Sequence, residues 1–240
     1  MKTILTRTFT VLLFLSAFSL TLNAQRIKGN GKLIEKTRQV GEFETLGVSG
    51  SFDVFLVKGR EGQIELSVEE NLEPYLVTEV ESGKLKIKWK KGSNINTTKS
   101  TKVTVYFEEL SGVALAGSGD VVSRDPLASD QMKVALAGSG DIRLELQANA
   151  TVAAVSGSGD LELSGRSTTF EAAVAGSGDI KASGLKSENA DLKISGSGTI
   201  EAHAEKEIVA RVSGSGDIKY KGNPDVEDIK VSGSGKVRSF

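Results

Sequence analysis

The chain has 240 residues, a formal net charge of −1 and 25% charged residues. This near-neutral balance gives no electrostatic reason to expect nucleic acid or an acidic membrane surface as a partner. The chain contains no cysteine, which excludes disulfides, and aromatic residues make up only 5% of it, which is few for an ordinary globular core.

Residues 1–24 have the pattern of a secretory signal peptide. Lys2 and Arg7 precede an apolar run from Val11 to Leu22, and the small residue Ala24 stands before the expected cleavage site. A transmembrane anchor needs about 20 apolar residues, and this run is shorter. We therefore expect an exported protein in the periplasm, on the outer surface or secreted, with no transmembrane segment in the mature chain.

Residues 25–39 are mostly polar and are predicted to form a loose N-terminal segment. Residues 40–112 contain runs of alternating apolar and polar residues, which predict strands, separated by glycine-rich turns. The runs are Phe52–Leu56, Ile64–Val68, Leu85–Trp89 and Val103–Phe107. A single helical turn is expected near Asn71–Leu76. The bulky residues of this region predict larger, less regular β coils that cap one end of the array that follows.

From residue 113 to residue 240 one glycine-rich tetrapeptide recurs seven times, at intervals of 18 to 21 residues. Its glycine pairs, each separated by one serine, are Gly117 and Gly119, Gly138 and Gly140, Gly157 and Gly159, Gly176 and Gly178, Gly196 and Gly198, Gly214 and Gly216, and Gly233 and Gly235. Apolar residues alternate on both sides of every pair, which predicts strand, tight turn and strand in each unit. The interval is too short for a βαβ unit, which needs about 30 residues, and it suits one coil of a β-solenoid.

One outward row of side chains tests the register of the coils. This row reads Val122, Arg143, Glu162, Lys181, Glu201, Lys219 and Arg238. Its signs alternate from Arg143 to Lys219, as expected if each side chain lies between its equivalents on the neighbouring coils. We therefore predict an all-β fold, a parallel β-helix with coils of about 19 residues and Gly-Ser-Gly corners, continuous with residues 40–112 as one domain.

Several segments are similar to the DUF2807 family, described as "putative auto-transporter adhesin, head GIN domain" and found mainly in Bacteroidetes. They are Phe43–Val54, Glu69–Leu72, Gly83–Ile87 and the Gly-Ser-Gly-Asp series, and residues 49–53 look like a degenerate copy of the repeated corner. The similarity extends from about Arg38 to Phe240. It implies a single-stranded, right-handed β-helix like that of pectate lyase, with glycine-serine corners between its two main sheets, and a role in cell adhesion.

Four aspartates follow the corner glycines on successive coils and could form a calcium ladder, because calcium is bound by clustered oxygens. They are Asp120, Asp141, Asp160 and Asp179. Thr199 and Lys236 interrupt the series, and the spacing differs from that of the calcium-binding nonapeptide repeat. Two carboxylates about 4.8 Å apart in water repel by only about 0.9 kcal/mol, so the ladder needs no ion. We expect structural corners, with glycine at positive φ and Ser and Asp bonding to backbone N–H groups, and no metal or cofactor site.

An enzymatic site has little support in the sequence. Pectate-lyase-like enzymes use carboxylate-bound calcium and a basic residue in a groove. Here the position just before each corner holds only alanine or serine, which is too small to form a convergent site. His203 is the only histidine, and the corner serines have no partnered base. We therefore predict no catalytic residues.

The expected function is an exported, non-enzymatic adhesion or binding module that recognises an unknown surface glycan or protein. A polysaccharide-active β-helix enzyme and a self-associating envelope scaffold are the alternatives. Lys230, Lys236 and Arg238 place like charges on the last coil, where they oppose end-to-end pairing of two copies. The chain is therefore expected to be a monomer or a weak oligomer.

Overall fold

The computed structural model describes residues 26–240, and the expected signal peptide over residues 1–24 lies outside this range. The described residues are mostly β-strand, with one 3-10 turn, η1 (Glu73–Tyr75), where the single helical turn was expected. No helix within residues 26–240 is long and apolar enough to cross a membrane.

Ten strands form the repeat region, and the longest of them, those of 16 to 18 residues, each make most of one coil. The ten strands are β10 (Gly112–Gly117), β11 (Asp120–Ser123), β12 (Leu127–Gly138), β13 (Asp141–Gly157), β14 (Asp160–Gly176), β15 (Asp179–Gly196), β16 (Thr199–Gly214), β17 (Asp217–Lys221), β18 (Val226–Gly233) and β19 (Val237–Ser239). Equivalent residues of neighbouring coils pair in parallel, as in Gly138 with Gly157 and Gly157 with Gly176. This confirms the predicted solenoid and its register.

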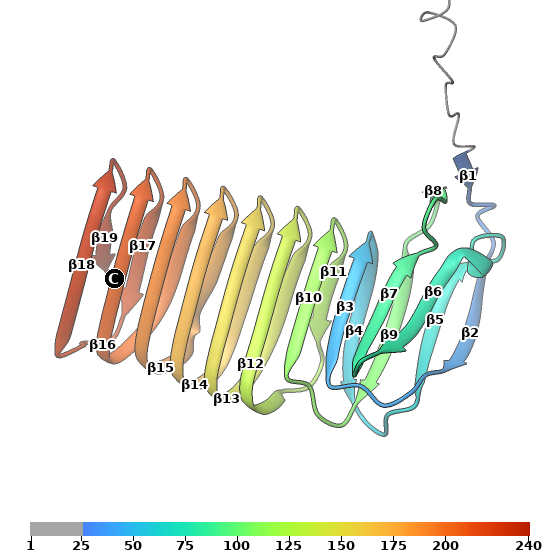
Figure 1. Cartoon of the computed structure of the whole chain (residues 1–240), viewed down its shortest axis with the longest axis horizontal. Coiled ribbons are helices and arrows are strands. Elements are labelled where there is room, and N and C mark those ends of the chain that lie inside the picture. The colour runs from blue at the N-terminus through green and yellow to red at the C-terminus, as the bar shows by residue number, and fades with distance from the viewer. Residues whose placement is uncertain (1–25) are drawn as a thin grey trace, which may run out of the picture.

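The path of one coil is visible in Figure 1. The segment before each Gly-Ser-Gly runs up through what we call the front sheet, and the segment after it runs down through the back sheet. Each long strand then bends at the edge opposite the corner and re-enters the front sheet one coil further from the N-terminal end. This path makes the β-helix right-handed, as the family resemblance implied.

A thin apolar core lies between the two sheets. Inward positions such as Leu136 on the front sheet and Ile142 on the back sheet are buried, and many core positions of the repeats are alanine or valine. Most of the large buried aromatic residues, such as Phe52 and Phe107, lie in the N-terminal part. Narrow coils have no room for large rings, which explains the low aromatic content.

The alternating charge row lies on the outer surface of the back sheet. The Arg143 Nε lies 2.7 Å from a carboxylate oxygen of Glu162, and the Lys219 ammonium lies 3.1 Å from that of Glu201. The Lys181 ammonium binds Asp160 on the preceding coil, at 2.6 Å. These pairs are partly solvent-exposed, so each contributes at most about 1 kcal/mol, and they report the register more than they stabilise it.

The two glycines of each corner serve different purposes. The first glycine has φ between 125° and 141° in all seven repeats, a conformation that penalises any side chain. The second glycine is not in this region, but a Cβ on Gly159 would overlap the backbone oxygen of Gly140 on the preceding coil. A Cβ on Gly157 would likewise overlap the oxygen of Gly138. Positive φ, expected for the corner glycines in general, is therefore confined to the first of each pair.

The N-terminal strands close one end of the solenoid. They are β1 (Arg26–Lys28), β2 (Leu33–Gln39), β3 (Thr45–Gly50), β4 (Phe52–Lys58), β5 (Gln63–Glu69), β6 (Leu76–Glu81), β7 (Lys84–Trp89), β8 (Asn94–Asn96) and β9 (Thr101–Phe107). Strands β3 and β4 form a coil whose corner pairs with the first repeat, Gly50 with Gly117 and Asp53 with Asp120, which confirms the degenerate corner.

The remaining cap strands are not laid down in sequence order. Strands β7 and β9 pair in parallel on the outer side of β3 and β4, and the chain then returns to place β10 and β11 on the other side. Strands β6, β5 and β2 add antiparallel edges beyond them. The larger, less regular β coils expected over residues 40–112 are therefore present only in part, because β3 and β4 form one coil and antiparallel strands terminate the stack beyond it.

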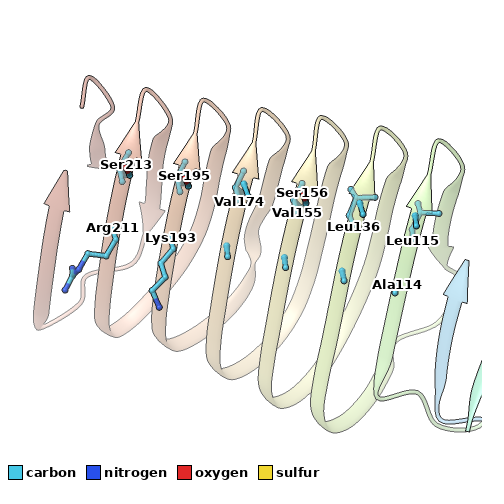
Figure 2. Close-up of a pocket in the computed structure, with 18 of the residues that line it drawn as sticks. Ala114, Leu115, Leu136, Val155, Ser156, Val174, Lys193, Ser195, Arg211 and Ser213 are labelled. Atoms are coloured by element: carbon cyan, nitrogen blue, oxygen red, sulfur yellow. The ribbon is translucent and has the colours of Figure 1, made fainter. Parts of the chain in front are cut away.

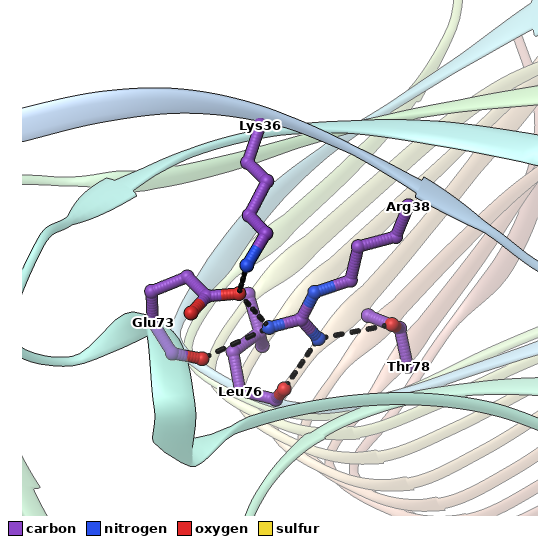
Figure 3. Close-up of polar contacts among 5 residues, drawn as sticks. All are labelled: Lys36, Arg38, Glu73, Leu76 and Thr78. Atoms are coloured by element: carbon purple, nitrogen blue, oxygen red, sulfur yellow. Dashed lines mark hydrogen bonds and ion pairs between the residues drawn. The ribbon is translucent and has the colours of Figure 1, made fainter.

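The prediction of a loose segment over residues 25–39 is also wrong for most of that range. Strand β1 pairs with β8, and β2 pairs with β5. Strand β2 is mostly exposed, which explains its polar sequence, and polar contacts fix it (Figure 3). The Arg38 guanidinium donates to the carbonyl oxygens of Leu76 (2.5 Å) and Glu73 (2.9 Å). The Glu73 carboxylate accepts from Arg38 at 2.6 Å and from Lys36 at 2.7 Å, and these bonds lower the pKa of Glu73 against the effect of burial.

A second polar contact holds the segment between β1 and β2. The buried carboxylate of Glu69 accepts hydrogen bonds from the N–H of Gly31 (2.6 Å), from the N–H and hydroxyl of Thr98 (2.8 and 2.6 Å) and from the N–H of Lys99 (3.3 Å). Burial raises the pKa of Glu69, but these hydrogen bonds outweigh it and leave the pKa below its usual value. A Cβ on Gly29 would overlap this carboxylate, so the segment packs directly against it.

Replacing either corner glycine of one coil should destabilise the fold more than replacing the serine between them. We expect Gly157→Val and Gly159→Val each to lower the free energy of unfolding by at least about 2 kcal/mol, because of strain and backbone overlap. Ser158→Ala should cost no more than about 1 kcal/mol, the value of one hydrogen bond. Urea titration of the three variants measures this, and equal midpoints would show that the corners do not require glycine.

Replacing Glu69 by Gln should loosen the N-terminal cap at neutral pH. Hydrogen bonds to a charged group contribute about 1.5–3 kcal/mol, so amide exchange over residues 26–32 and 94–100 should accelerate by about tenfold or more, while β13 stays unchanged.

The effect of Glu69→Gln should depend on pH. Because the pKa of Glu69 is lowered by folding, its stabilisation is complete above the unfolded pKa of about 4.3 and is lost as pH falls through the folded value. The exchange rates of the variant and the parent chain, corrected for intrinsic rates, should therefore converge in acid. A difference that persists undiminished well below the folded pKa would contradict this role.

Candidate functional site

An open groove of about 770 Å³ crosses the coils on the outer surface of the front sheet (Figure 2). Its floor is a row of residues that stand three positions before each corner glycine and pair in register from coil to coil. They are Gly47, Ala114, Ala135, Ala154 and Ala173. Successive coils lie about 4.8 Å apart, so this row is roughly 19 Å long. We call this row the alanine floor.

A second row of small residues borders the alanine floor on the side of the corners. It consists of Ser49, Ala116, Ala137, Ser156 and Ala175. The intervening residues, such as Leu136 and Val155, point into the core and contribute little beyond their backbone. The groove therefore presents methyl groups and paired backbone, with few side-chain hydrogen-bonding groups.

The apolar character of this surface is unusual for its position. Outward positions of a sheet that faces water are normally polar, as they are in the charge row of the back sheet. On the front sheet, Ala135, Ala154 and Ala173 are exposed, and the nearby Val152 is 41% exposed. Contiguous exposed apolar surface in a soluble protein commonly marks a binding site.

One lysine lies at the N-terminal end of the alanine floor. The Lys84 side chain crosses Gly47, where a Cβ would stand 3.1 Å from the lysine Nζ. Its neighbours Lys86 and Lys88 form ion pairs with Glu81 and Glu79 of β6. Within residues 26–240, Lys84 itself forms no ion pair, so its ammonium is available to an anion at this end of the groove.

The opposite end of the groove is also cationic. The row that forms the alanine floor continues as Lys193, Arg211 and Lys230. The Lys193 ammonium lies 2.9 Å from Asp191, and the Arg211 guanidinium pairs with Asp228. Figure 2 shows the Lys193 and Arg211 side chains extending away from the corners. The charges of Lys193 and Arg211 are thus largely balanced by neighbouring carboxylates, whereas Lys230 forms no ion pair within the described residues.

The four aspartates considered for calcium stack in one line beside the corners, and they accept hydrogen bonds from the next coil. The N–H of Asp141 donates to Asp120 (3.3 Å), that of Asp160 to Asp141 (3.1 Å) and that of Thr199 to Asp179 (2.7 Å). Lys181 occupies a second oxygen of Asp160. Within residues 26–240, no group of three or more His, Cys, Asp or Glu side chains is arranged to hold a metal ion.

The residues considered for catalysis lie away from the groove. His203 is on β16, half-buried, with its Nε2 3.7 Å from Glu205, and it pairs in register with Lys186 and Lys221. The corner serines stack along one edge, where the N–H of Ser158 donates to the oxygen of Gly138 at 2.9 Å. The residues that line the groove, all within the described range, include no histidine, aspartate or glutamate.

Reasoning from the sequence missed this groove. The small side chains before each corner predict no convergent site, whereas on a stacked sheet such residues create a smooth apolar surface. The available signal was the position three residues before each corner glycine, which is alanine in four successive repeats and then basic in three. Lys84 had no such signal, since it comes from a strand outside the repeats.

Calcium should leave the stability of the chain nearly unchanged, because the aspartates already act as acceptors between coils and need no ion to stack. Thermal unfolding with millimolar calcium and with a chelator measures this. A melting temperature raised by more than roughly 10 °C by calcium, and restored by the chelator, would show that the ladder is a metal site.

Three solved structures from Bacteroides and Parabacteroides resemble the chain. A "putative adhesin" from Bacteroides fragilis NCTC 9343 has a TM-score of 0.81 at 23% identity, covers 89% of this chain and 100% of its own, and shows the fold alone. A "putative lipid binding protein" from Parabacteroides distasonis ATCC 8503 has a TM-score of 0.74 at 29% identity, with 90% and 100% covered. A "putative adhesin" from Parabacteroides merdae ATCC 43184 has a TM-score of 0.71 at 25% identity, with 90% and 99% covered. No curated protein sequence matches the chain.

The family match agrees with the resemblance found in the sequence. The DUF2807 model matches residues 42–224, which include β3 to β17 and therefore most of the cap and of the repeat coils. The chain belongs to the DUF2807 family, described as "Putative auto-transporter adhesin, head GIN domain".

Proposed function

We propose that the chain is an exported, non-enzymatic binding module of the adhesin type, and that the groove on the front sheet is the surface that contacts its partner. The exposed alanine floor is the observation that carries this proposal. Apolar surface left in water is unfavourable, and a partner that covers it gains free energy in proportion to the area removed from water.

The family and its relatives support binding rather than chemistry. The family description and two of the similar structures refer to adhesion, and the third refers to lipid binding. The groove has cations at both ends but no side chain that would act as a general acid or base near neutral pH, apart from those lysines. A polysaccharide-active enzyme would need such groups around its substrate.

Repetition along the axis determines what shape of partner the groove can accept. Each coil presents the same small residues about 4.8 Å from the last. An extended partner that lies along the axis would therefore meet an equivalent contact on every coil. Its affinity would rise with the number of coils it covers, and short side chains let it approach the sheet closely.

A long side chain placed on the alanine floor should block binding. We expect Ala154→Gln to weaken binding to the partner by at least about tenfold, because the glutamine would occupy the floor and its amide would lose water on contact. Ser164→Gln is the matched control, since Ser164 is exposed on the next coil but lies in the back sheet. Both variants should keep the melting temperature of the parent chain.

Binding of the labelled chain would be measured on a glycan array, on lipid vesicles, on single-chain amphiphiles and on immobilised copies of the chain. A polysaccharide cleavage assay with added calcium would be run beside it. Loss of binding in Ala154→Gln but not in Ser164→Gln supports the proposal. Equal loss or equal retention in both variants, or unsaturated sugar products, would contradict it.

A further inference from the structure

We propose that the groove binds a single-chain anionic amphiphile of the long-chain fatty acid class, with the acyl chain along the alanine floor and the carboxylate at Lys84. This inference rests on the proposed function, because it assigns a ligand class to the same groove. The alanine floor alone would not identify a ligand, and the assignment depends on which groups the groove can and cannot satisfy.

The part of the groove over the alanine floor offers very few hydrogen bonds to a ligand, and the serines Ser195, Ser213 and Ser232 follow only beyond it. Backbone N–H and C=O groups of the floor strands are already paired with neighbouring coils. Ser49 and Ser156 supply the only side-chain hydroxyls in the second row between Ser49 and Ala175. A sugar ring pressed onto this surface would lose water from its hydroxyls without replacement, at a cost of about 1–3 kcal/mol for each such group.

An extended peptide faces the same difficulty as a sugar. Peptides that add to a sheet do so at an edge strand, where unpaired backbone groups can bond to them. The floor lies in the middle of the front sheet, with paired strands on both sides. A hydrocarbon chain has no hydrogen-bonding groups. It is therefore the kind of extended ligand that can lie on this surface without losing hydrogen bonds to water.

A second copy of the chain is disfavoured by the charges at the ends of the groove. Two front sheets that meet while running in opposite directions would bring Lys84 of one copy toward the basic row of the other, in which Lys230 has no ion-pair partner within the described residues. Two that run in the same direction would bring Lys84 against Lys84. Like charges in contact oppose either arrangement, whereas an anionic ligand would be attracted to them.

Among these cations, Lys84 fits a ligand head group best. It forms no ion pair within the described residues, and the missing side chain of Gly47 gives its stem room to lie over the floor. The nearest acidic neighbour across the strand pair, Glu81, is held by Lys86. Lys193 and Arg211 already have aspartate partners. Lys230 forms no ion pair within the described residues either, but it lies three coils beyond Ala173, behind Lys193 and Arg211, whereas Lys84 lies directly over Gly47 of the alanine floor. A carboxylate at Lys84 would gain a charge-assisted hydrogen bond without breaking an existing ion pair.

The test uses dodecanoate and dodecanol, both below the concentrations at which they aggregate, with calorimetry on the purified chain. We expect Lys84→Gln to weaken dodecanoate binding by about tenfold, the effect of one hydrogen bond to a charged group, and to leave dodecanol binding unchanged. Lys86→Gln is the matched control, because Lys86 lies on the same strand and face but is paired with Glu81. Ala154→Gln should weaken the binding of both ligands.

Several outcomes would overturn the inference. If Lys84→Gln and Lys86→Gln weaken dodecanoate binding equally, Lys84 is not the site of the carboxylate head group. No binding of dodecanoate to the parent chain, while Ala154→Gln still abolishes binding to a glycan or a protein, would reject the fatty acid and leave the proposed function standing. If Ala154→Gln affects no partner of any kind, both proposals fail together.

Discussion

Backbone contact between successive corners is the constraint on which the rest of this structure depends. At every Gly-Ser-Gly, a carbonyl oxygen of the preceding coil occupies the space where a side chain would begin, as Gly138 does for Gly157. Coils can therefore stack in only one register at this edge. Because side chains alternate between two faces, a fixed corner fixes which residue lies above which along the whole coil.

The same register produces opposite surfaces on the two sheets. On the back sheet it aligns residues of alternating charge, such as Arg143 and Glu162, and their ion pairs leave that surface self-satisfied. On the front sheet it aligns Ala135 with Ala154 and Ala173, and nothing within residues 26–240 covers them. Covering such an apolar surface removes it from water, and this is the physical reason for which we propose that a partner binds here.

The N-terminal cap is held together by a different kind of interaction. Buried or half-buried carboxylates collect donors from distant segments, as Glu69 does from Gly31 and Thr98 and as Glu73 does from Arg38. Such contacts let strands with few apolar residues join the fold, so β2 is ordered although its sequence is polar. Separately, β7 pairs in parallel with β3, and this places Lys84 at the end of the groove.

The sequence by itself determined the β-solenoid, the coil length, the corners and the register, because each of these follows from residues that repeat at a fixed interval. Local alternation and glycine spacing are sufficient for such features. Only the tertiary structure decided the order of the cap strands, the place of β2 and the groove. The alanine floor becomes a surface only when coils stack, and Lys84 reaches it only because the chain turns back and lays β7 against β3. Contacts of this kind join segments that share no periodic pattern, so no local signal encodes them.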